Sequence, residues 1–269
     1  MGIIQPAASV VITVKNEAKN LPSLLNILLK SSIPAEIIIV DSNSEDGTAE
    51  LMARISKENS LVKYIRMPCS RGQGRNIGVR ESETGNILFT DGDAVPQEQW
   101  IENMVSALKD NELVAGKTES FDGKGTSTIP RMELFFMGFE ITLPSMNLAI
   151  RKELFNRLKG FDESFVTAED IDMNLRAVMA GAKWAVCDKC VVSHRSRENI
   201  PALMKQAFWN GYGRRQLRNK NREIWKQIEK GKIRRESMTF HWLLRNFTGL
   251  LGYMYCMLRK INFEENAGQ

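Results

Sequence analysis

The sequence predicts an α/β protein with a mostly parallel central sheet flanked by helices. Four short apolar runs, at 9–14, 37–40, 61–65 and 87–89, have the length and composition of buried strands. Segments with apolar residues at helical spacing separate these runs, and a polar loop follows each run. Because parallel strands must be joined by crossovers, this alternation predicts a parallel sheet with right-handed connections.

The helices between these strands are predicted at 21–29, from about 48 to 57, and at 74–83. The later elements are predicted in this order: strand 113–117, a Gly-, Thr- and Ser-rich loop 121–130, an apolar segment 132–141, strand 145–150, helix 151–158, a helix with Thr167 as N-cap, short strands 183–186 and 190–193, and helices within 201–229 and 240–260. The loop is a candidate lid, and the apolar segment is a candidate cover for an active site.

The fourth apolar run ends in two carboxylates, Asp91 and Asp93, with Gly92 between them. In open α/β sheets, ligands bind beyond the carboxyl ends of the strands, so both aspartates are expected at the mouth of a crevice. Glycine lets the backbone turn sharply and lets a ligand approach closely. Carboxylate oxygens suit Mg²⁺ or Mn²⁺, which in turn would hold phosphates. The alternative is an ordinary polar turn, because Asp and Gly are common turn residues.

The charge of the chain is unevenly distributed. The 269 residues are 43% hydrophobic and 26% charged, as in a globular protein, and carry a net charge of +5. Between 195 and 235 the local net charge is +10, so the rest of the chain carries −5. We therefore expect two parts, a domain at 1–195 and a basic, amphipathic helical extension at 196–269. An anionic partner of the extension could be a membrane surface, a phosphorylated lipid or a nucleic acid.

Four cysteines, Cys69, Cys187, Cys190 and Cys256, are too few and too scattered for a disulfide framework, which favours a reducing compartment. Cys187 and Cys190 have zinc-like spacing, with His194 nearby and Cys69 as the only available fourth ligand. The alternative interpretation is small buried side chains. No secretory signal and no run of about 20 apolar residues is visible, so the expected location is cytoplasmic.

The segment 71–78 contains three glycines, as the dinucleotide-binding fingerprint does. That fingerprint requires G-x-G-x-x-G at the first helix of a βαβ unit. Here the third glycine comes one residue late, and the loop follows the third strand instead of the first. The pattern therefore argues against NAD binding and favours a loop that passes close to a nucleotide.

Five motifs in register resemble the family 2 glycosyltransferases of GT-A fold. They are 11–17, 39–48, 75–78, the D-x-D at 91–93 and the Glu-Asp pair at 169–170. The resemblance covers roughly residues 8 to 195. It implies roles for the following residues: Asp41 for the base or ribose of a sugar nucleotide, Thr13, Asn16 and Glu17 for the first loop of that pocket, Arg75 near the nucleotide, Asp91 and Asp93 for a divalent metal and the ribose, Asn147 beside the donor sugar, Asp170 as general base, and His194 near the metal.

What the resemblance implies is an inverting, metal-dependent glycosyltransferase that uses Mn²⁺ or Mg²⁺. It would move a hexose from a UDP-sugar or GDP-mannose to a hydroxyl of a glycan, a lipid-linked acceptor or a small molecule. Basic and aromatic residues among the apolar ones at 240–260 suggest helices in a membrane interface, which would place the protein peripherally on the cytoplasmic membrane face. The equal alternative is a helix packed on the protein's own surface.

The residues fit two other functions less well. A sugar-1-phosphate nucleotidyltransferase needs a Gly-rich first loop, whereas the loop at 15–17 has no glycine. A non-catalytic module that binds anionic surfaces would account for the basic extension, but no nucleic-acid motif accompanies the charge, so nucleic acid is not expected as a partner.

Overall fold

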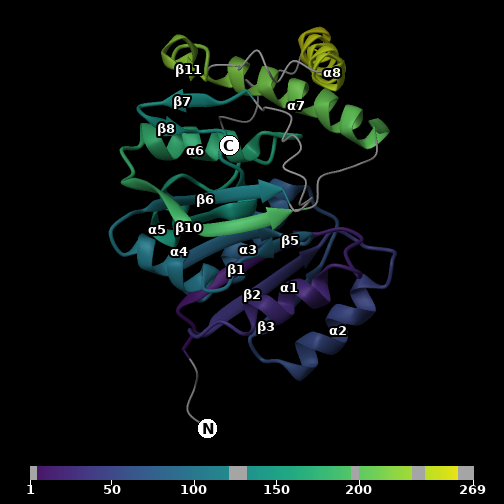
Figure 1. Cartoon of the computed structure of the whole chain (residues 1–269), viewed down its shortest axis with the longest axis vertical. Helices are drawn as coiled ribbons and strands as arrows, with labels where there is room; N and C mark the ends of the chain where they lie inside the picture. Colours follow the sequence, from purple (N-terminus) through teal and green to yellow (C-terminus); the bar gives the residue numbers. More distant parts are fainter. Residues whose placement is uncertain (1–4, 121–131, 195–199, 232–239, 260–269) are drawn as a thin grey trace.

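The computed structural model describes residues 5–120, 132–194, 200–231 and 240–259. Figure 1 shows a large central sheet with helices packed around it. Two long C-terminal helices and a small second sheet form a layer at the end of the molecule away from the N-terminus.

The first half of the chain builds the parallel part of the large sheet. Its strands are β1 (Ala8–Val14), β2 (Ala35–Asp41), β3 (Val62–Arg66) and β4 (Asn86–Asp91). They lie in the order β3-β2-β1-β4, and the pairings between them are parallel. The connecting helices are α1 (Leu21–Leu28), α2 (Thr48–Glu58) and α3 (Arg71–Glu81). The predicted alternation of strands and helices is therefore confirmed.

The second half makes the sheet mixed. Strand β9 (Leu148–Arg151) runs antiparallel to both β4 and β6 (Leu113–Ser120). Strand β10 (Trp184–His194) is parallel to β6, and β5 (Ala94–Pro96) is antiparallel to β10. Strand β9 runs back along β6, with Leu148 opposite Ala115 and Ile150 opposite Leu113, so the two strands are antiparallel. The α/β class is confirmed, and the parallel strands are joined by a single reversed strand in the middle of the sheet.

The remaining elements are α4 (Trp100–Leu108), β7 (Leu134–Phe136), β8 (Phe139–Glu140), the 3-10 helix η1 (Ser145–Asn147), α5 (Lys152–Arg157), α6 (Glu169–Met179), α7 (Ile200–Lys220), the 3-10 helix η2 (Trp225–Gln227), β11 (Glu229–Lys230) and α8 (Phe240–Leu258). Strands β11, β7 and β8 form the small sheet. Two local predictions need correction. The strand expected from 145 begins with η1, and the two short strands expected at 183–193 are one strand, β10, whose register shifts between Cys187 and Val191.

A disulfide joins Cys187 and Cys190 at this register shift in β10. Both sulfur atoms are therefore engaged with each other, so the zinc interpretation of these two cysteines is not supported. The alternative interpretation, small buried side chains, holds for Cys190, which is buried, whereas Cys187 is partly exposed, and the disulfide between them was not predicted. Cys69 is half-buried and Cys256 is buried, and both are free thiols.

Strands β1, β2 and β4 are buried on both faces, which explains their largely apolar sequences. Along β1, Val11 faces one hydrophobic core, whereas Val10 and Ile12 face the other. Trp100 and Phe89 are among the largest fully buried side chains of these two cores. Two filled cores hold the sheet rigidly, and its strand ends can then position polar groups accurately.

Helix α3 crosses β1 so closely that Gly78 has no room for a side chain. A Cβ atom at Gly78 would overlap Cγ1 of Val11 in the middle of β1. We expect Gly78→Ala to destabilise the protein by about 1–3 kcal/mol, as overpacking of a core does. Urea unfolding monitored by tryptophan fluorescence would measure the change. Gly85→Ala is the matched control, because a Cβ atom at Gly85 would have no neighbour within 4 Å. Equal stability of the two variants would contradict the close approach of α3 to β1.

Candidate active site

The carboxyl ends of β1, β2 and β4 lie side by side at one edge of the sheet. Thr13 is in register with Asp91 on β4, and Val14 is in register with Asp41 on β2. The loop that follows β1 therefore starts between the two aspartates. The structure brings together the strand-end residues that the sequence placed around one crevice.

The loops after β1 and β2 are tied to each other by hydrogen bonds. The Asn16 backbone N–H donates to the Ser44 hydroxyl at 2.7 Å, and the Glu17 N–H donates to Thr48 Oγ1 at 3.0 Å. Asn16 also accepts a hydrogen bond from the Glu45 N–H through its side-chain oxygen. Asn16 has a φ of 61°, a left-handed conformation that asparagine tolerates better than most residues. Because of these bonds, the two loops form one connected wall of the site.

Asp41 is fully buried at the base of this wall. Its Oδ1 accepts hydrogen bonds from the backbone N–H and the hydroxyl of Ser44, at 2.9 and 2.6 Å. Its Oδ2 accepts from the Tyr64 hydroxyl at 2.7 Å, and burial together with Asp41 raises the pKa of Tyr64. Asp41 therefore shapes the loop that follows β2. Tyr64 was not predicted from the sequence, where its only signal was its position on the neighbouring strand.

Carboxylates gather where β4 ends. Gly92 lies against Glu17, whose Cγ would be 3.0 Å from a Cβ at this glycine. Burial raises the pKa of Glu17, and the charges of Asp93, Asp46 and Asp91 raise it further. Negative charge is thus concentrated in a small region at the mouth of the site.

Arg75 is buried and links the end of β4 to the start of α6. Its guanidinium donates to Glu169 Oε1 at 2.8 Å and to Asp91 Oδ1 at 3.1 Å, and it lies over the ring of Phe161. Burial opposes the charge, but Asp91 and Glu169 outweigh burial and raise the arginine pKa. Arg75 therefore has protein partners that connect the D-x-D turn to the helix carrying the Glu-Asp pair.

Asp170 is the second residue of α6 and lies beside this ion pair. Its Oδ1 accepts a hydrogen bond from the Ile171 N–H at 2.8 Å, and its Oδ2 is 3.5 Å from the Ser145 backbone nitrogen. Burial and then the charge of Glu169 raise the pKa of Asp170 to about 6, against the opposing effect of Arg75. Because Arg75 bonds Glu169 instead of Asp170, Asp170 keeps a raised pKa, as a general base requires.

The helix start that carries Asp170 differs from the prediction. Ala168 is the N-cap of α6 and has a φ of 71°, so the expected N-cap at Thr167 is wrong. Because Ala168 adopts this left-handed conformation, α6 begins at Glu169, one residue later than predicted. Close packing holds this turn, since a Cβ at Gly213 of α7 would overlap the Thr167 carbonyl.

Asn147 lies deeper than its expected place beside a donor sugar. It is fully buried, and its amide N–H groups donate to the carbonyls of Lys117 and Cys190 at 2.7 and 2.9 Å. Its oxygen accepts from the indole N–H of Trp100 at 2.9 Å. The amide thus joins β6, β10 and α4, and both of its N–H groups are already used within the protein.

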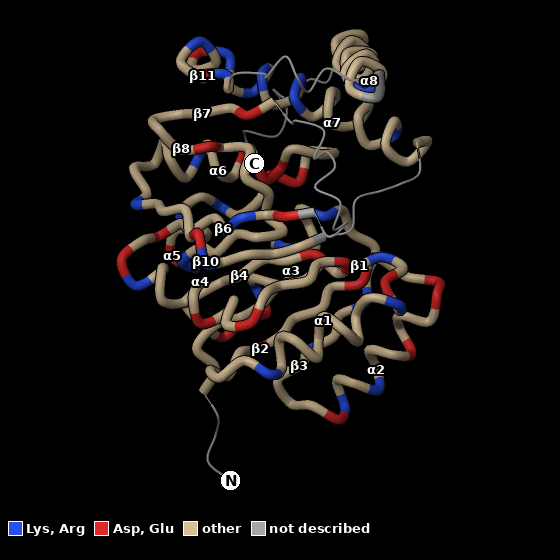
Figure 2. Tube along the Cα trace, viewed as in Figure 1, with Lys and Arg blue, Asp and Glu red and all other residues tan. Residues whose placement is uncertain are grey.

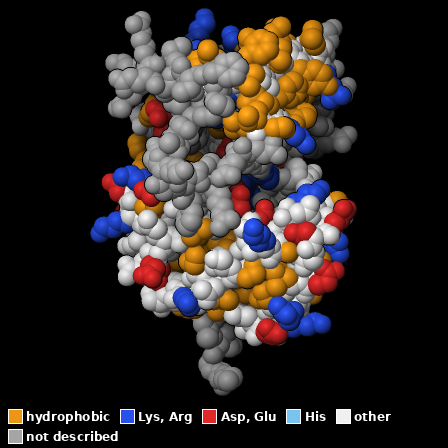
Figure 3. Space-filling view, turned by 45° about the vertical axis from the view of Figure 1, so that its right-hand side comes forward, with side chains coloured by type: hydrophobic (Ala, Val, Ile, Leu, Met, Phe, Trp, Pro, Cys, Tyr) orange, Lys and Arg blue, Asp and Glu red, His pale blue; other side chains and the backbone are white. Residues whose placement is uncertain are grey.

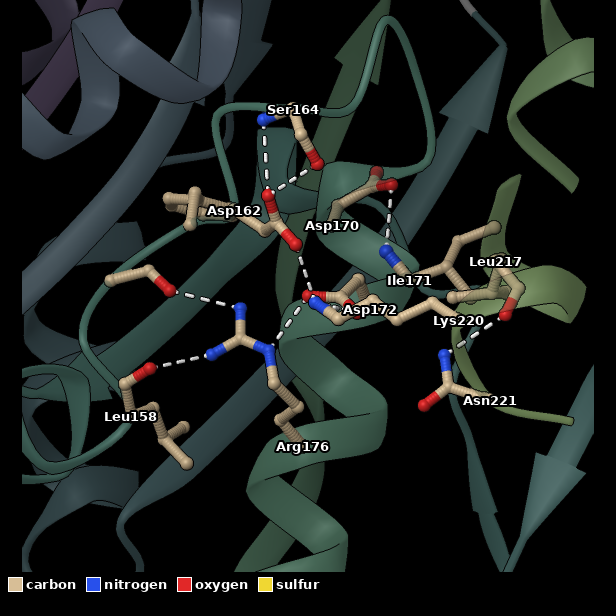
Figure 4. A network of polar contacts seen from close by, with 12 residues as sticks. Leu158, Asp162, Ser164, Asp170, Ile171, Asp172, Arg176, Leu217, Lys220 and Asn221 are labelled. Carbon is tan, nitrogen blue, oxygen red and sulfur yellow. Dashed lines mark hydrogen bonds and ion pairs between the residues drawn. The ribbon is translucent and has the colours of Figure 1, made fainter. Parts of the chain in front are cut away.

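A polar network below Asp170 docks α7 on α6 (Figure 4). Asp172 is fully buried and pairs with Arg176 at 2.7 Å and with Lys220 of α7 at 2.8 Å. Lys220 also pairs with Asp162 at 2.6 Å. This link was not predicted from the sequence, although the i, i+4 spacing of Asp172 and Arg176 signalled one of its pairs. The network places α7 in direct contact with α6, the helix of the candidate base.

Two predicted features lie outside the described residues. The candidate lid at 121–130 falls in the gap between 120 and 132. His194 ends β10, where its backbone pairs with Ala94, but its side chain is not among those described. Its place near a metal stays a prediction.

Within the described part of the chain, no three His, Cys, Asp or Glu side chains form a ready-made metal site. A complete cage is not required, since Mg²⁺ is usually bound by one or two carboxylates together with substrate phosphates and waters. Asp93 is exposed and Asp91 is partly exposed, and Glu17 adds negative charge beside them. The donor set at the end of β4 therefore fits a hard divalent cation that arrives with a phosphorylated ligand.

The strand ends that bring Asp41 near the D-x-D turn, and the link through Arg75 from that turn to the Glu-Asp pair, are the arrangement expected of a GT-A fold. The model for glycosyl transferase family 2 matches residues 9–169, which is more than half of the chain. The protein belongs to this family and is a glycosyltransferase.

Relatives extend the match beyond the family model. Glycosyltransferase AglE of Haloferax volcanii is 26% identical over 256 residues, which cover 90% of this chain and 81% of AglE. Mannosyltransferase PcManGT from Pyrobaculum calidifontis, solved with GDP-Man and Mn²⁺, has a TM-score of 0.61 at 17% identity and covers 94% of this chain and 74% of that one. S. aureus TarS 1-349 in complex with UDP-GlcNAc has a TM-score of 0.60 at 17% identity, with coverages of 91% and 81%. These structures confirm the GT-A fold.

Proposed function

We propose that this glycosyltransferase transfers a hexose with inversion, from a UDP-sugar or GDP-mannose to a hydroxyl acceptor, in a metal-dependent reaction. The observation that carries the proposal is Asp170, which has a raised pKa and directly follows Glu169, the residue that Arg75 joins to Asp91 of the D-x-D turn. The solved neighbours support the choice of donors, because they hold UDP-GlcNAc and GDP-Man. The acceptor would be a glycan, a lipid-linked molecule or a small molecule.

The reaction is an in-line displacement at the anomeric carbon. The acceptor oxygen forms a bond to this carbon as the bond to the nucleoside diphosphate breaks, which inverts its configuration. The hydroxyl proton passes to the Asp170 carboxylate. Nucleotide contacts are assigned to the wall formed by Thr13, Asn16, Glu17 and Asp41. Arg75 holds Asp91 and Glu169 in place instead of meeting the donor directly.

Asp91 and Asp93 would hold Mn²⁺ or Mg²⁺, and His194 is a third candidate ligand. When bound, the metal neutralises the negative charge that develops on the departing diphosphate. The carboxylates that converge on Gly92 support this assignment, because their mutual repulsion is relieved by a cation. Strands β7 and β8 lie in the apolar segment that the sequence suggested as a cover, and they belong to the small sheet, which is drawn above α6 in Figure 1.

Asp93→Ala is expected to remove metal-dependent nucleotide binding. A ligand at 100 times its dissociation constant stabilises a protein by about 2.7 kcal/mol, which raises Tm by roughly 5–10 °C for a chain of this size. A thermal-shift panel of UDP-, GDP- and dTDP-sugars, with and without Mn²⁺, would show this rise for one nucleotide and only with metal. The variant should lose the rise, whereas Asp110→Ala, on the exposed surface after α4, should keep it.

Two results would count against the proposal. One is a nucleotide-induced rise in Tm that is the same with metal and with a chelator. The other is an Asp93→Ala variant with an undiminished Mn²⁺ effect, which would move the metal away from the D-x-D turn.

A further inference from the structure

The outward face of α8 is an exposed apolar surface. Its central stripe has the spacing i, i+4, i+7, i+11 and i+15, which places side chains on one side of a helix. The stripe comprises Leu243 (53% exposed), Phe247 (60%), Leu250 (53%), Met254 (49%) and Leu258 (83%). Leu251, Tyr255 and Met257 widen it. Figure 3 shows this surface, here called the α8 face, as a continuous orange area at the upper right.

The opposite side of α8 is firmly attached to the protein. Gly249 and Gly252 let the helix approach α7 so closely that a Cβ at Gly252 would overlap the Phe208 carbonyl. Tyr253 accepts hydrogen bonds from Arg215 at 3.1 Å and from Arg218 at 2.8 Å. The α8 face is thus the outer side of a helix whose other side already packs on α7. It does not need a further element of this chain to hold the helix in place.

The charges of α7 and α8 indicate what kind of surface the α8 face would bind. Helices α7 and α8 contain six Lys or Arg residues and no Asp or Glu, and Arg259 directly follows α8. In Figure 2 the positions of Asp and Glu lie outside α7 and α8, and Figure 3 shows blue cations at the border of the apolar area. A second copy that met the α8 face across a two-fold axis would bring positive charge against positive charge. An anionic lipid surface offers both apolar tails and negative headgroups.

We propose that the α8 face is a docking surface for an anionic lipid bilayer, in which α8 lies parallel to the membrane plane. No helix among the described residues is long and apolar enough to cross a membrane. Lys220 joins α7, on which α8 packs, to Asp172 of the helix that carries Asp170, so the proposed docking surface is linked to the candidate site through α7. This inference concerns the location of the enzyme and does not depend on the donor or the metal.

Flotation of the full chain with lipid vesicles tests the proposal. We expect binding to vesicles that contain phosphatidylglycerol, weak binding to pure phosphatidylcholine, and loss of binding at high salt. Each cation near an anionic surface contributes about fivefold to the partition coefficient at low ionic strength. The double variant Leu250→Glu/Met254→Glu should bind at least about tenfold more weakly, because two apolar side chains are lost and two negative charges are added.

Leu29→Glu is the matched control, because Leu29 is also exposed (37%) but follows α1 on the distant half of the molecule. Circular dichroism would establish that the variants are folded. Equal flotation of the double variant and the control would overturn the proposal. So would a lipid-free dimer in sedimentation velocity that the double variant converts to monomer, since it would assign the α8 face to a second copy. Vesicle binding is measured without donor or metal, so its failure is distinguishable from failure of the proposed reaction.

Discussion

Replacing Asp170 by Asn is expected to lower the turnover number by about 100- to 10,000-fold while leaving nucleotide binding nearly unchanged. The amide keeps the size of the carboxyl group but cannot accept the acceptor's proton, and a positioned general base contributes a factor of this order. Radiolabelled sugar transfer measures the turnover, and the thermal shift with donor and Mn²⁺ measures binding. Asp110→Asn makes the same chemical change on the exposed surface and should have no effect.

The pH profile gives a second, independent readout of the same residue. The carboxylate form is the base, and burial with Glu169 raises the pKa of Asp170 to about 6. Transfer should therefore be fully active well above pH 6 and fall tenfold per pH unit below it. The Asn variant should lose this acid limb together with its activity. If the Asp170→Asn variant retained turnover, Asp170 would not be the base. The same conclusion would follow if its residual activity still fell below pH 6 as in the unmodified protein.

The parallel half of the sheet could be predicted because three of its strands, β1, β2 and β4, are buried on both faces and are therefore short apolar runs that stand out in the sequence. A run such as 37–40 is continuously apolar only if no side of it meets water. The convergence of Asp41, Asp91 and the first loop followed from topology, since parallel strands end at the same edge of a sheet. Local sequence patterns were therefore enough to predict both the fold class and the approximate position of the site.

The partners of the site residues could not be predicted in the same way. Arg75 and Glu169 are 94 positions apart, and nothing local indicates that they form a buried ion pair. Asn147 is similar, since its three hydrogen bonds join strands and a helix that become neighbours only in the folded protein. The reversal of β9 also depends on long-range pairing. The general rule is that sequence shows where polar groups emerge, and tertiary packing decides which of them stay available to a ligand.

Arg75→Met is expected to be among the most destabilising single substitutions in the catalytic domain, by about 3–5 kcal/mol. The side chain of Glu169 is 6% exposed, so removing Arg75 would leave a buried carboxylate without its cation. Asp91 would lose the same partner, and the D-x-D turn would lose its link to α6. Urea unfolding gives the change in the free energy of unfolding.

A double-mutant cycle with Glu169→Leu separates the ion pair from the packing of the arginine side chain. Removing both charged groups leaves no unpaired buried charge from the pair, so the double variant should be more stable than Arg75→Met alone. Arg157→Met is the matched control, because its pair with Glu112 has an Nη2–Oε1 distance of 3.0 Å but lies at the surface. Such a pair contributes about 0–1 kcal/mol. If Arg75→Met proved as mild as Arg157→Met, the Arg75–Glu169 pair would not hold the two halves of the site together.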